Sequence, residues 1–106
     1  MRPIQSDEKP LVEALFTQAG LTLYDSLRVE DLDRPNQGLL LRKGSSITRL
    51  SVSSLEFQDS DGVAVRAVLN CTAEGHPAEI EINKSNQGQI SRWPKDAEIE
   101  SGIILD

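Results

Sequence analysis

Clustered carboxylates are the residues of this chain with the most evident capacity for chemistry. Asp25, Glu30, Asp31 and Asp33 all fall within the segment 25–33. Two acids held at a fixed distance can divide the roles of acid and base in glycoside hydrolysis, and carboxylate oxygens are ligands that Mg²⁺ prefers. Clustered acids on an acidic protein are more often solvated surface, and only 4% of the residues are aromatic, which disfavours sugar binding. A hydrolase is therefore the alternative interpretation of this segment.

The nucleophiles and soft metal ligands are few. The chain has one histidine and one cysteine, which is too few for a zinc cluster. Cys71 and His76 would have to meet across a turn to form a catalytic dyad, and Cys71 falls on the apolar face of an expected strand, where a thiol is usually inert. Asp59–Gly62 resembles part of a calcium loop but lacks the later acids and the bidentate Glu. We expect no cofactor, no metal and no catalytic residue.

The charge balance argues against nucleic acid. Seventeen acids face eleven Lys and Arg, giving a formal net charge of -6, and such a field repels a phosphate backbone. The excess acid lies in the two ends of the chain, at 1–33 and 96–106. An acidic face speeds encounter with a basic protein. The candidate partner-binding residues are Asp25, Glu30, Asp31, Asp33, Asp96, Glu98 and Glu100.

The apolar runs are short. The longest have three residues, such as Leu39–Leu41, whereas a membrane helix needs roughly 20. The first residues carry charge where the apolar segment of a secretory signal would lie. A solitary cysteine fits a reducing compartment. We therefore expect a cytoplasmic protein with no membrane partner.

The segment that follows residue 7 predicts a helix. Leu11, Val12, Leu15, Phe16 and Ala19 recur at helical spacing, and they form one apolar stripe. Ser6 or Asp7 is suited to cap the N-terminus, so we start the helix near Asp7, and Gly20 is placed to end it.

The rest of the chain alternates with period two between turn signals, which is typical of antiparallel strands. The apolar frame shifts near Ser53 and Ser54, where a β-bulge would keep both halves of a strand facing one core. Asp59–Gly62 is expected to form a hairpin turn. A further strand is expected at 90–93, ended by Pro94, with Trp93 closing the core.

These elements predict an α+β fold. The N-terminal helix is expected to pack on one face of an antiparallel β-meander of about five or six strands. No stretch has the composition of an interdomain linker, so residues 1–106 are interpreted as a single domain.

Several short motifs resemble a family of short uncharacterised bacterial proteins, a domain of unknown function. The resemblance implies a bacterial origin and carries no activity. The matching residues are Arg2–Ile4, Glu8–Lys9, Leu11–Leu15, Val29–Leu32, Asp61–Val65, Leu69–Asn70, Glu79–Lys84 and Trp93–Pro94.

Function is interpreted as binding to another protein. As a class, small acidic cytosolic domains are similar to immunity proteins, which neutralise a toxin by occluding its active site. Two alternatives stay open: a regulatory or assembly module that forms a homo-oligomer, such as a homodimer joined through an exposed sheet edge, and the hydrolase described above. The oligomeric state is expected to be a monomer or a homodimer.

Overall fold

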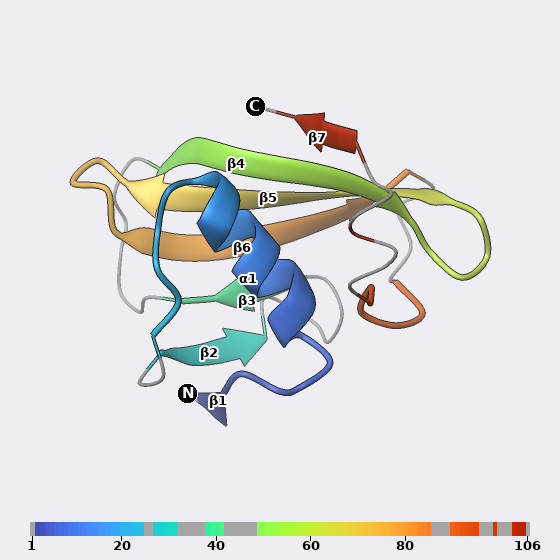
Figure 1. Cartoon of the computed structure of the whole chain (residues 1–106), viewed down its shortest axis with the longest axis horizontal. Helices are drawn as coiled ribbons and strands as arrows, with labels where there is room; N and C mark the ends of the chain where they lie inside the picture. Colours follow the sequence, from blue (N-terminus) through green and yellow to red (C-terminus); the bar gives the residue numbers. More distant parts are fainter. Residues whose placement is uncertain are drawn as a thin grey trace.

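The computed structural model describes residues 2–24, 27–31, 38–41, 49–85, 90–95, 99 and 103–105. These residues form one α-helix and one antiparallel sheet (Figure 1). The elements in chain order are β1 (Arg2–Pro3), α1 (Lys9–Gln18), β2 (Arg28–Asp31), β3 (Gly38–Leu40), β4 (Arg49–Gln58), β5 (Ala64–Thr72), β6 (Pro77–Lys84) and β7 (Ile103–Leu105).

The helix α1 forms where its apolar stripe predicts it. Leu11, Val12, Leu15 and Phe16 are all buried. The helix begins at Lys9 after a turn at residues 6–8, and Glu8 occupies the N-cap position without a side-chain cap. Gly20 has a φ of 76°, a left-handed conformation that ends a helix at little cost for glycine. Because Glu8 is the N-cap residue, the expected capping by Ser6 or Asp7 is wrong by two residues or by one.

The sheet consists of two antiparallel meanders joined edge to edge. Its strand order is β1-β2-β3-β6-β5-β4-β7, so β3 pairs with β6 across a long sequence separation. Figure 1 shows α1 lying across one face of the sheet, and β7 as a short strand outside β4. The predicted class, a helix on an antiparallel sheet, is confirmed. The described sheet has seven strands where about five or six were expected, and its edge strands β1 and β7 are only two and three residues long.

The core lies between α1 and the sheet. Phe16, Leu69 and Ile80 are at most 1% exposed, and Trp93 belongs to the same cluster. Trp93 therefore closes the core, as predicted. Cys71 is also buried in this cluster.

The strand arrangement departs from expectation at two places. Residues 90–93 form bends and coil, not a strand, because the backbone N–H of Ser91 donates to the carboxylate of Asp59 at 2.7 Å. The predicted bulge in β4 is present between Ser51 and Ser53. It does not bury the first half of the strand, since Leu50 and Val52 remain 52% and 42% exposed.

Candidate functional site

Two of the seven predicted partner-binding acids lie among the residues that the structure describes. Glu30 and Asp31 lie in β2, whereas Asp25, Asp33, Asp96, Glu98 and Glu100 lie outside the described residues. Asp31 pairs with Leu39 of β3 and Glu30 pairs with Leu40. Successive strand residues point to opposite faces, so Asp31 lies on the side of the sheet that carries α1 and Glu30 lies on the other. These two acids do not share a face.

Asp31 belongs to an ion cluster at the β1 edge. The guanidinium of Arg2 donates to both carboxylate oxygens of Glu8 at 2.8 Å and to Oδ1 of Asp31 at 2.9 Å. Glu8 also accepts the backbone N–H of Gln5 at 2.9 Å and is only 2% exposed. The hydrogen bonds that Arg2 donates to Glu8 and then to Asp31 raise its pKa, although partial burial opposes the shift. The cluster connects β1 to β2 and to the start of α1, so its role is structural.

A second ion cluster joins β4, β6 and the segment that carries Trp93. Lys84 Nζ donates to Asp59 Oδ2 at 2.8 Å and to Asp61 Oδ2 at 2.7 Å. The side chains of Asp59 and Lys84 are 1% and 5% exposed. Asp59 Oδ1 accepts the backbone N–H of Ser60, and Oδ2 accepts that of Ser91.

The charges in this second cluster stabilise one another. Burial opposes ionisation of Asp59, yet its pKa lies below the ordinary value because Lys84 and the N–H groups of Ser91 and Ser60 donate to its carboxylate. Hydrogen bonds from Lys84 and Val63 lower the pKa of Asp61. Hydrogen bonds to Asp59 and then Asp61 raise the pKa of Lys84. Groups held in their charged forms in this way fasten the structure and are poorly suited to exchange protons near neutral pH.

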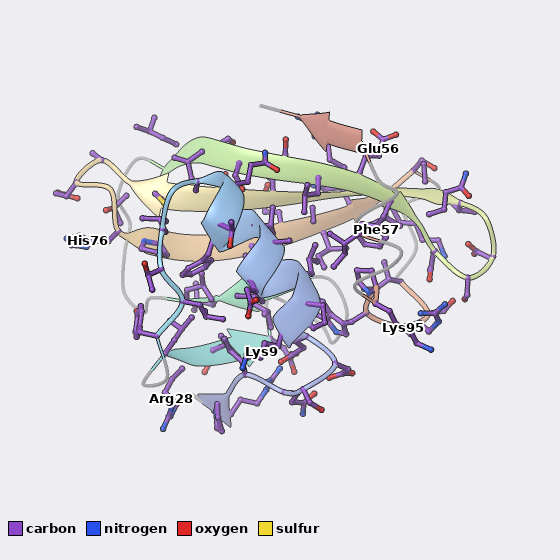
Figure 2. The ribbon with its side chains drawn as sticks, viewed as in Figure 1. Lys9, Arg28, Glu56, Phe57, His76 and Lys95 are labelled. Carbon is purple, nitrogen blue, oxygen red and sulfur yellow. The ribbon has the colours of Figure 1, made fainter. Side chains whose placement is uncertain are left out.

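The thiol and the imidazole are not placed for joint chemistry. Cys71 is 2% exposed and belongs to the core, and burial raises the pKa of its thiol. His76 is exposed in the turn between β5 and β6. Figure 2 shows His76 at one end of the sheet, pointing away from the body of the molecule. Within the described part of the chain, no group of three or more His, Cys, Asp or Glu residues could hold a metal ion.

Two shallow hollows flank the start of α1. One, of about 420 Å³, is lined by Pro10, Trp93 and Pro94, with Arg92 and Lys95 also on its wall. The other, of about 170 Å³, lies between β1 and the segment after α1 and is lined by residues that include Ile4 and Tyr24. Both are open to solvent. Asp7 lines the first together with the two bases, and Lys9 is the charged residue that lines the second.

The outer edge of β4 is a different kind of feature. β7 pairs with residues Ser54–Glu56 of this edge. Among the described residues nothing pairs with the outer side of Arg49–Ser53, whose other side pairs with β5. We call the outer side of Arg49–Ser53 the open edge. Its side chains Leu50 and Val52 are two of the three large hydrophobic residues that are exposed in the described structure, the third being Tyr24.

The open edge was not expected from the sequence, because the bulge near Ser53 and Ser54 was expected to keep both halves of this strand facing one core. Leu50 lies opposite Cys71, on the side of the sheet that carries α1. Farther along β4, the Ser53 hydroxyl donates to the carbonyl oxygen of Leu15 at 2.8 Å, so α1 covers the strand from that point. The sequence did mark this part of the chain as unusual in its charge, because residues 34–55 contain four bases and no acid in a chain of net charge -6.

No helix in the described part of the chain is long and apolar enough to cross a lipid bilayer. A search of curated proteins returned no match, and a search of solved structures also returned none. A family model does match, over residues 1–94, which include α1, the open edge and both ion clusters. The chain therefore belongs to the family described as a domain of unknown function, DUF6984.

Proposed function

We propose that this chain is a small acidic protein-binding module that contacts its partner through the open edge of β4. The observation that carries the proposal is the exposure of Leu50 and Val52, 52% and 42%, beside backbone that pairs with no described strand on that side. An unpaired strand edge presents N–H and C=O groups that another chain can pair with. Apolar side chains beside it contribute burial to such a contact.

Binding is favoured over catalysis by the way the charged groups are used. Asp31, a member of the 25–33 cluster, accepts a hydrogen bond from the guanidinium of Arg2 at 2.9 Å. Asp59, Asp61 and Lys84 are engaged with one another. The hydrolase alternative requires carboxylates that are available to substrate or metal, and these geometries lend it little support.

The net charge of -6 gives the module a preference among partners. A negative field speeds encounter with a basic protein and slows encounter with an acidic one. The finer proposal, an immunity-type inhibitor that covers a basic active site with Glu30 and Asp31 together, draws less support because the two acids leave β2 on opposite faces.

The proposal is tested by affinity capture with three baits: the wild type, a Leu50→Lys/Val52→Lys double variant, and Tyr24→Lys. Tyr24 is a matched control because it is 49% exposed and lies by β1, at the other side of the sheet. Proteins retained by the wild type and by Tyr24→Lys should be lost from the double variant. Retention of the same proteins by all three baits would contradict the proposal.

A further inference from the structure

The turn between β4 and β5 contains a dipeptide that can react with itself. Asp61–Gly62 is the one Asp–Gly step in the sequence, which has no Asn–Gly step. Glycine has no Cβ to keep its backbone nitrogen away from the carboxyl group of the preceding side chain. The turn projects from one end of the sheet (Figure 1), and the Asp61 side chain is 45% exposed, so water reaches it. The groups needed for a spontaneous change of the backbone are therefore present.

The reaction is formation of an isoaspartate through a succinimide. The Gly62 nitrogen bonds to Cγ of Asp61 and loses its proton, and an oxygen of the Asp61 carboxyl group leaves as water. Addition of water to the backbone carbonyl carbon of Asp61 then breaks its bond to the Gly62 nitrogen, so the main chain runs through Cγ. Water is the one other reactant. The step requires a carboxyl group that is protonated and a nitrogen that can approach Cγ.

The folded chain restrains both reacting groups. Asp61 Oδ1 accepts the backbone N–H of Val63 at 3.0 Å, and Oδ2 accepts Lys84 Nζ at 2.7 Å. The Gly62 N–H donates to the carbonyl oxygen of Asp59 at 2.8 Å. Hydrogen bonds from Lys84 and then Val63 lower the pKa of Asp61, so the less reactive carboxylate form is favoured. Attack at Cγ therefore requires the turn to open first.

We propose that Asp61–Gly62 is a site of isoaspartate formation, and that Lys84 and the N–H of Val63 keep the modification slow in the folded chain. Lys84 is a firm restraint because its own side chain is 5% exposed and donates to Asp59 Oδ2 at 2.8 Å. The buried ion pair thus holds an ammonium group against the exposed carboxylate. This role is independent of what binds the open edge.

The modification also alters the turn that it starts from. An isoaspartate adds one carbon to the main chain between Asp59 and Gly62, so the hydrogen bond that joins these two residues changes its geometry. The new carboxylate is attached to Cα of residue 61 and no longer lies where Lys84 Nζ meets Oδ2. The restraints are therefore weaker after the reaction than before it.

Incubation of the purified chain near neutral pH tests the site. Isoaspartate is measured by peptide mapping with mass spectrometry and by labelling with an isoaspartyl methyltransferase. The full chain unfolded in urea should accumulate isoaspartate at position 61 roughly tenfold faster than the folded chain, because opening of the turn no longer costs free energy. Asp61→Glu should give no product at this position, since its longer side chain cannot close the same ring. Equal rates in the folded and unfolded chains would overturn the proposal.

Lys84→Met tests the ammonium group, and Asp59→Asn is its matched control. Both variants lose the buried ion pair, but Asp59→Asn keeps Lys84 beside Asp61. With both variants folded by circular dichroism, Lys84→Met should form isoaspartate about fivefold faster than Asp59→Asn, the effect that a partly exposed ion pair allows. Equal rates in the two variants would show that Lys84 does not restrain Asp61.

A double variant keeps this comparison valid if Lys84→Met does not fold. Asp59→Asn/Lys84→Met leaves no buried charge without a partner, so it is expected to lose less stability than Lys84→Met. It differs from Asp59→Asn in Lys84 alone and should show the same fivefold acceleration over that variant. Lys84→Arg, which keeps a cation at this position, should modify at a rate close to that of the wild type. A double variant no faster than Asp59→Asn would contradict the proposal.

Discussion

Asp59→Asn tests whether the buried ion cluster holds the Trp93 segment onto the sheet. Asp59 Oδ2 accepts from both Lys84 and the N–H of Ser91, and Oδ1 accepts from Ser60. An amide has a single acceptor oxygen, so whichever way it is turned its NH₂ group faces one of these donors. Removing one partner of a buried ion pair costs about 3 kcal/mol. For a chain of this length that lowers Tm by about 12 °C, at about 4 °C per kcal/mol.

Trp93 supplies the assay, because it is the single tryptophan of the chain and lies two residues from Ser91. Denaturant unfolding followed by Trp93 fluorescence should show the loss of stability in Asp59→Asn. Acrylamide should quench the native fluorescence more strongly than in wild type, where Trp93 is 6% exposed. Asp61→Asn is the matched control: Asp61 contacts the same Lys84, but its side chain is 45% exposed, so its loss should matter far less.

The stabilisation that the Asp59 carboxylate contributes depends on pH in a definite direction. The folded-state pKa of Asp59 lies below its ordinary value, so its stabilisation is present above about pH 4 and is lost as pH falls through the folded-state pKa. The difference in unfolding free energy between wild type and Asp59→Asn should therefore narrow below pH 4. This account of the cluster would be refuted if the unfolding free energies of wild type and Asp59→Asn differed by less than about 1 kcal/mol at pH 7. It would also be refuted if their difference stayed constant down to pH 3.

Three further outcomes are expected. Arg2→Met should lower the free energy of unfolding by about 2 kcal/mol, since it leaves the buried Glu8 carboxylate without its bidentate partner; chemical denaturation against an Arg2→Lys control measures this. Cys71 should react slowly with a disulfide reagent in the native protein and at once in denaturant, because burial raises the pKa of its thiol; rapid native labelling would contradict its place in the core. Trp93→Ala should cost about 3–5 kcal/mol, measured by circular dichroism, and a near-neutral result would show that Trp93 does not close the core.

The local elements of this fold could be predicted, because each depends on residues close in sequence. The spacing of Leu11, Val12, Leu15 and Phe16 specifies one face of a helix, and Gly20 supplies its end. The turn at Asp59–Gly62 follows from Gly62, whose φ is 82°. The frame shift in β4 similarly indicated its bulge.

The features that were missed depend on contacts between distant residues. Nothing in the residues around Ser91 signals that a carboxylate 32 positions away captures its N–H. Alternation marks Leu50 as facing the same side as the core, but it does not say where α1 stops covering the sheet. Charge clustering identified acids without revealing that Arg2 binds Asp31, or that Glu30 and Asp31 face opposite ways.

Amide hydrogen exchange at Leu50–Ser53 tests the central claim most directly. These amides should become protected when the chain binds a protein recovered by affinity capture, while those around Tyr24 stay unchanged. Protection confined to other surfaces, with the Leu50–Ser53 amides exchanging as fast in the complex as in the isolated chain, would contradict the assignment of the open edge of β4 as the binding surface.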